Sequence, residues 1–103
     1  MTARLYPITI TRMKLTATVH GRVQNVGYRM FARDAARRLN LGGHVRNLPD
    51  GSVYVTATGE EAALRELVRH LERGPHAARV ETVECEWSPD ATEHSPRPFE
   101  VLS

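Results

Sequence analysis

The chain has 103 residues, of which 41% are hydrophobic and 25% are charged, a composition typical of one folded domain rather than of a disordered chain. Its net charge of +2 is too small for an extended polyanion-binding surface, and its one cysteine, Cys85, excludes an intramolecular disulfide. We expect a cytoplasmic protein, because no apolar run reaches the roughly 18 residues that span a bilayer and residues 1–12 lack the apolar core of a signal peptide.

The first half of the chain predicts a strand followed by a helix. Residues 13–20 alternate between apolar and polar side chains, which is typical of a half-buried strand. From Tyr28 the apolar spacing becomes that of a helix, and Asn40 with the pair Gly42-Gly43 ends it. The helix face expected in the core consists of Tyr28, Phe31, Ala32, Ala35 and Leu39.

The second half predicts a hairpin, a second helix and two more strands. Residues 44–47 and 52–58 flank a Pro-Asp-Gly turn and read as hairpin arms. Thr58 and Glu61 fit a capping box, which would open a helix that ends before Gly74. Residues 80–87 alternate as a strand, with Cys85 on its inner face, and residues 99–102 form a last short strand.

These elements predict one domain over residues 13–103, preceded by a flexible arm over residues 1–12 whose residues 8–11 could pair at a sheet edge. The order is βαββαβ with one additional strand. We expect a ferredoxin-like α+β sandwich, in which an antiparallel sheet carries both helices on one face.

The stretch GRVQNVGYR, residues 21–29, is unusual for a small domain. Its glycines and Asn25 tolerate a left-handed backbone, so the loop could turn several N–H groups toward one point at the start of the helix. Arg29 would lie in the first helical turn, where a cation opposes the helix dipole. A bound anion would remove that conflict. The alternative is a plain strand-to-helix connection with a solvated arginine.

Asn47 ends the strand that follows the first helix. In a βαββαβ fold this strand lies close to the first one, so the carboxamide could point toward the same loop, accept a hydrogen bond from water and donate one to an oxyanion. Alternatively, Asn47 only begins the Asp50-Gly51 turn.

Both segments resemble signatures of the acylphosphatase family. GRVQNVGYR is similar to its phosphate-binding loop, and GHVRNLPDGSVYVTATG to its second signature. The similarity extends from about Lys14 to the closing FEV. The second signature is matched at Gly43, Val45, Arg46, Asn47, Gly51, Val53 and Gly59.

This resemblance implies hydrolysis of small acyl phosphates to a carboxylate and inorganic phosphate, with no metal, no cofactor and no covalent enzyme intermediate. It implies that Asn47 orients the attacking water and that Arg29 holds the phosphoryl oxygens together with the loop amides, which belong to Arg22, Val23, Gln24, Asn25 and Val26. The expected partners are the acyl phosphate, and inorganic phosphate as product and inhibitor; we expect a monomer that binds neither nucleic acid nor membrane.

Two residues depart from the family pattern. Asn25 replaces a glycine, and His44 replaces an aromatic residue. The histidine could affect packing beside Asn47 and add a pH dependence.

Other functions are poorly supported by the sequence. The five histidines lack paired metal-ligand spacing. RNA-recognition motifs share the element order but need aromatic residues on the exposed sheet face, where only Tyr54 is expected. Similar domains also occur within larger carbamoyl-transfer proteins.

Overall fold

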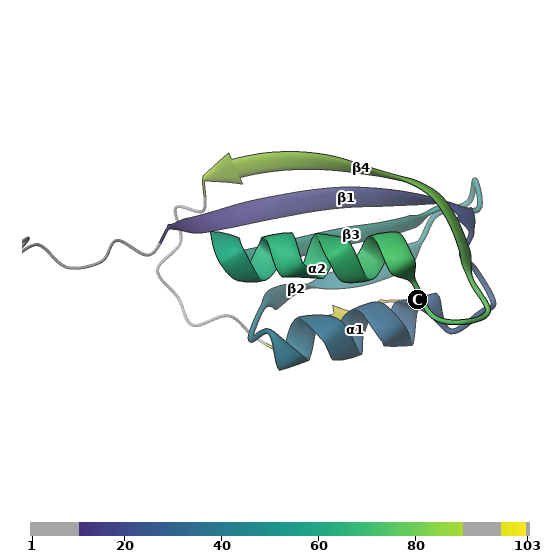
Figure 1. Cartoon of the computed structure of the whole chain (residues 1–103), viewed down its shortest axis with the longest axis horizontal. Helices are drawn as coiled ribbons and strands as arrows, with labels where there is room; N and C mark the ends of the chain where they lie inside the picture. The colour runs from purple at the N-terminus through teal and green to yellow at the C-terminus, as the bar shows by residue number, and fades with distance from the viewer. Residues whose placement is uncertain (1–10, 90–97, 103) are drawn as a thin grey trace, which may run out of the picture.

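A computed structural model describes residues 11–89 and 98–102 and has the expected element order (Figure 1). A five-stranded sheet has the strand order β4-β1-β3-β2-β5. In Figure 1 both helices lie against the same face of the sheet, so the ferredoxin-like α+β architecture is confirmed. The elements are β1 Arg12–Arg22, α1 Tyr28–Arg38, β2 Gly42–Asn47, β3 Val53–Glu60, α2 Glu61–Arg73, β4 Arg79–Pro89 and β5 Glu100–Val101.

The sheet is mixed rather than wholly antiparallel. β3 pairs antiparallel with β1 and with β2, and β4 pairs antiparallel with β1. The short strand β5, however, runs parallel to β2, with His44 opposite Glu100. The alternation pattern could not reveal this direction, because it records which side chains face inward and not which way a neighbouring strand runs.

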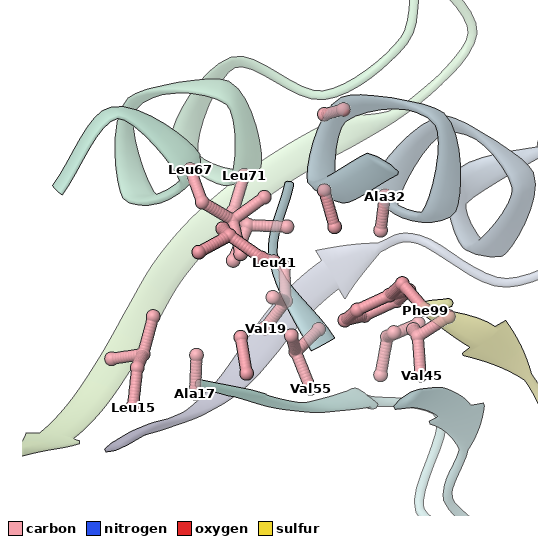
Figure 2. Close-up of a cluster of buried hydrophobic side chains, with 14 of the residues drawn as sticks. Leu15, Ala17, Val19, Ala32, Leu41, Val45, Val55, Leu67, Leu71 and Phe99 are labelled. Carbon is pink, nitrogen blue, oxygen red and sulfur yellow. The ribbon is translucent and has the colours of Figure 1, made fainter. Parts of the chain in front are cut away.

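The core lies between the helices and the sheet (Figure 2). Alternating residues of β1 and β3 and one face of each helix are fully buried, as the two periodicities predict. Phe31 and Leu39, expected in the core, are only half-buried. The buried side chains drawn in Figure 2 include Leu15, Ala17, Val19, Ala32, Leu41, Val45, Val55, Leu67, Leu71 and Phe99.

β1 contains an irregularity at Gly21, near its C-terminal end. The register between β1 and β4 shifts between His20 and Gly21, where φ is 131°. A Cβ atom at this position would overlap the carbonyl oxygen of Arg79 on β4. Glycine is therefore required for β1 and β4 to stay paired as far as Arg22.

The predicted capping box before α2 is wrong. Thr58 lies within β3, and Glu60 at the N-cap position makes no side-chain capping bond. The pairing of β3 with β1 continues as far as Glu60, which holds Thr58 in an extended conformation. The amide of Glu61 instead donates to the carbonyl oxygen of Thr11 at 2.8 Å, while its carboxylate pairs with Arg65.

Residues 1–10, 90–97 and 103 lie outside the described residues, so the N-terminal arm remains a prediction, and of the predicted pairing of residues 8–11 only Thr11, which lies just before β1, is described. β1 itself begins at Arg12. Neither helix of the described ranges is both long and apolar enough to cross a membrane.

Candidate active site

The loop between β1 and α1 has the backbone that its sequence predicts. Asn25 has φ 63°, and Gly27, the N-cap residue of α1, has φ 79°, so both are left-handed. Buried Val23 anchors the loop to the core. Within the described residues, the amides of residues 24–27 donate no hydrogen bond to another protein group. The loop thus offers unpaired N–H groups beside a helix N-terminus, which is the arrangement that binds anions.

Arg29 lies in the first turn of α1, which contains no acidic residue. Its Nη1 atom donates a hydrogen bond to the carbonyl oxygen of Leu102 at 3.0 Å. On the same helix, Arg37 donates through Nε to the carbonyl oxygen of Phe99 at 2.8 Å. The two arginines attach the end of the chain to α1, and the first of these bonds directs the Arg29 guanidinium from the helix toward β5.

Asn47 is the last residue of β2 and pairs with Val53 of β3. By strand alternation it shares the face of Val45, which is buried beneath the helices. Within the described part of the chain its carboxamide has no hydrogen-bond partner. Asn47 lines the same pocket as Arg29, with a volume of about 80 Å³. The structure therefore brings Asn47 to the loop.

The turn after Asn47 is held by other residues. Asp50 Oδ1 accepts hydrogen bonds from the Ser52 amide at 2.9 Å and from Ser52 Oγ at 2.6 Å. Both bonds lower the pKa of the Asp50 carboxyl group, and the bond from the Ser52 hydroxyl has the larger effect. The amide of Gly51 donates to the Leu48 carbonyl oxygen at 3.1 Å. Asn47 is thus not needed to form the turn, which leaves its side chain available to the pocket.

Gln24 connects the loop to this turn. Its Nε2 atom donates to the carbonyl oxygens of Leu48 at 2.8 Å and Ser52 at 2.9 Å. A single side-chain amide therefore joins the segment that precedes Arg29 to the segment that follows Asn47. Sequence reasoning did not find this contact, because both acceptors are main-chain atoms whose position depends on the turn.

The pocket contains some of the predicted site residues but not all. Val23, Asn25, Arg29 and Asn47 line it together. Three predicted loop residues do not: Arg22 is the exposed end of β1, the Gln24 side chain bonds the hairpin, and Val26 packs against the core. Gly27, the last residue of the predicted 21–27 loop, also lines the pocket. Sequence reasoning did not assign Tyr28 and Met30 to the site, although both are chain neighbours of Arg29.

Tyr28 fixes the start of α1 from beneath the pocket. It is buried, and its hydroxyl donates to the carbonyl oxygen of Leu71 in the last turn of α2 at 2.6 Å. That carbonyl belongs to the group that a helix C-terminus leaves without an intrahelical partner. Burial raises the pKa of the Tyr28 phenol far above its usual value, so the hydroxyl remains a donor.

His44 lies away from the pocket. Strand alternation places its ring on the sheet face opposite that of Asn47, where its centroid is 6.3 Å from that of Tyr54. Arg46 lies 5.5 Å from the Tyr54 ring centroid. The expected effect of His44 on packing beside Asn47 is therefore not found.

The similarity to known proteins agrees with this geometry. The sequence model of the acylphosphatase family matches residues 15–101. The chain is 51% identical over 78 residues to an acylphosphatase of Thermus thermophilus, covering 76% of this chain and 89% of that protein. It is 54% identical over 80 residues to an acylphosphatase of Pseudomonas paraeruginosa, covering 78% and 88%.

The crystal structure of acylphosphatase from Bacillus subtilis has the same fold, with a TM-score of 0.81 and 30% identity over 88% of this chain and 99% of that chain. The fold and the loop beside a helix N-terminus are those of a small α+β domain with a candidate anion-binding pocket. The chain belongs to the acylphosphatase family, and its activity is the hydrolysis of acyl phosphates.

Proposed function

We propose that Arg29 and the amides of residues 22–26 hold the phosphoryl group of the substrate, and that Asn47 positions the attacking water. The observation that carries this proposal is that Arg29 and Asn47, from different elements, line one pocket with the loop. The unpaired amides of residues 24–27 and the absence of acidic residues from the first turn of α1 support an anion there.

The reaction needs no strong base in the pocket. The water oxygen attacks phosphorus while the bond from phosphorus to the acyl oxygen breaks, and the electron pair of that bond leaves with the carboxylate. A phosphate oxygen takes the proton of the water. Because a carboxylate is a good leaving group and the transition state is loose, positioning and charge stabilisation carry the catalysis. Arg29 stabilises the equatorial oxygens, and the Asn47 carbonyl oxygen accepts a hydrogen bond from the water.

The same geometry suggests the partners. Inorganic phosphate carries the oxygens that the loop would hold, so it acts as product and competitive inhibitor. We further propose that the protein works without a metal ion, since the guanidinium and the amides supply the positive potential that a metal would provide. We also propose that it is a cytoplasmic monomer that binds neither nucleic acid nor membrane. Hydrolysis with a chelator present tests the metal, and light scattering tests the monomer.

The decisive experiment compares four purified proteins in benzoyl phosphate hydrolysis, followed by ultraviolet absorbance with EDTA present. Arg29→Ala should lose phosphate inhibition and at least about a hundredfold in kcat, the scale of a lost transition-state donor. Asn47→Ala should lose a similar factor in kcat but keep phosphate inhibition.

The matched control is Arg33→Ala, which removes a half-buried arginine of α1 that pairs with Asp34. It should retain both activity and inhibition. Substantial turnover in both Arg29→Ala and Asn47→Ala would overturn the proposed roles.

A further inference from the structure

The pocket that holds the phosphoryl group in the proposed function has little room for anything else. Its volume is about 80 Å³, and it is lined by only seven residues. A phosphoryl group held by Arg29 and the loop amides would occupy this small pocket, so the acyl part of the substrate would extend to the rim. The chemistry of the rim should accordingly decide which acyl groups the enzyme favours.

Met30 is the apolar side chain at this rim. Among the described residues only two large hydrophobic side chains are exposed, Met30 at 48% and Leu102 at 38%. Both adjoin Arg29, one as its chain neighbour and the other through its carbonyl oxygen. Met30 lines the pocket and Leu102 does not. A single exposed apolar side chain needs no explanation by itself. Met30, however, lies beside the proposed phosphoryl site, where the acyl group of a bound substrate would contact it.

The helix directs Met30 toward the substrate. Side chains of an α-helix lean toward its N-terminus, and Met30 is the third residue of α1, so its thioether leans back over the loop. Its neighbours in the pocket lining offer no comparable surface, since Val23 and Tyr28 are buried and Asn25 is polar. A thioether is flexible and makes favourable contacts with aromatic rings.

We propose that Met30 is the specificity-determining residue against which the acyl group packs, so that the enzyme favours acyl phosphates with a large apolar or aromatic acyl group over acetyl phosphate. This inference rests on the proposed placement of the phosphoryl group at Arg29. Contact with Met30 removes apolar surface of both partners from water, and an acetyl group is too small to gain much from it.

The test compares benzoyl phosphate with acetyl phosphate as substrates of the wild type, Met30→Leu and Met30→Gln. Leucine and glutamine have similar size and helix propensity, so the two variants differ chiefly in polarity at an exposed position and both should fold. Met30→Gln should lower kcat/KM for benzoyl phosphate by about three- to tenfold and leave that for acetyl phosphate within about twofold. Met30→Leu should keep the wild-type ratio.

Inhibition by inorganic phosphate should be the same in all three proteins, because phosphate has no acyl group. An unchanged benzoyl-to-acetyl ratio in Met30→Gln would overturn the inference. Equal losses for both substrates, accompanied by weaker phosphate inhibition, would also overturn it by placing Met30 at the phosphoryl group. A wild-type protein that hydrolyses neither substrate would instead overturn the proposed function, and this inference with it.

Discussion

Asn25 shows how one residue can depart from a family pattern and keep the backbone that the site needs. Its φ of 63° is one that L-residues adopt at a cost of roughly 1–2 kcal/mol and that asparagine tolerates better than most. Its exposed side chain lines the pocket. The substitution therefore changes the rim of the anion site more than the path of the loop.

We expect Asn25→Ala to lower the free energy of unfolding by about 1 kcal/mol and to weaken inhibition by inorganic phosphate, because alanine resists the left-handed conformation. Asn25→Gly should bind phosphate at least as tightly as the wild type, since glycine adopts that conformation freely and adds no side chain to the pocket. Urea unfolding and phosphate inhibition constants check both results. Equal phosphate affinity in the two variants would show that the loop does not depend on this backbone angle.

The sequence predicts the conformation and position of some site residues but not the contacts of others. Arg29 and the left-handed residue at Asn25 follow from the local pattern, because glycine spacing and helix periodicity are local properties. The partners of Gln24 do not, since its acceptors are main-chain oxygens 24 and 28 residues away. Packing of His44 against Tyr54 is likewise a property of the strand pairing.

At the scale of elements, hydrophobic periodicity predicted the strands and helices, and tertiary pairing decided their ends. β1 extends to Arg12 and Arg22 because both ends pair with neighbouring strands. The same pairing includes Thr58 in β3, so Thr58 does not form the predicted cap of α2. A capping box is a local signal, and the ladder hydrogen bonds of a central strand outweigh it.

Gln24 holds two elements of the site in register, the loop before α1 and the hairpin after β2. We expect Gln24→Met, which keeps the side-chain length but removes the donor, to reduce kcat by about tenfold because Asn47 is no longer fixed relative to the loop. Two hydrogen bonds are lost, so the free energy of unfolding should also fall by about 1–3 kcal/mol. Phosphate inhibition should change much less, since Arg29 and the loop amides remain.

Kinetics on benzoyl phosphate and urea unfolding of the same preparations separate these effects. The control is Val68→Ala, which removes apolar contacts from half-buried Val68 on α2 and should lower stability without changing kcat at 25 °C. If Gln24→Met loses stability but keeps the wild-type kcat, Gln24 supports the fold and does not position the site.

At the scale of the whole molecule, the strand order explains why the site forms where it does. β1 and β2 both pair antiparallel with β3, so they run in the same direction and end at the same edge of the sheet. One strand separates them, and Asn47 of β2 lies level with Val19 of β1, since both pair with Val53, so these two positions are about 10 Å apart. The loop after β1 and Asn47 at the end of β2 are therefore neighbours by topology, although Arg29 and Asn47 lie on different elements.

Tyr28 links the site to the rest of the molecule, because its hydroxyl joins the first residue of α1 to the last turn of α2. Tyr28→Phe would leave the Leu71 carbonyl oxygen buried without this donor. We expect the free energy of unfolding at pH 7 to fall by about 1–2 kcal/mol. Chemical unfolding followed by circular dichroism measures this difference.

The pH dependence separates the hydrogen bond from simple packing. The pKa of Tyr28 is raised in the folded protein, whereas an unfolded tyrosine titrates near pH 10. The unfolded state therefore loses this proton first, so the stabilisation is complete below about pH 10 and declines by about 1.4 kcal/mol per pH unit above it. Because phenylalanine does not titrate, the wild-type advantage over Tyr28→Phe should shrink between about pH 10 and pH 11. A difference that stays constant across this range would mean that the Tyr28 phenol ionises equally in both states, contrary to its burial.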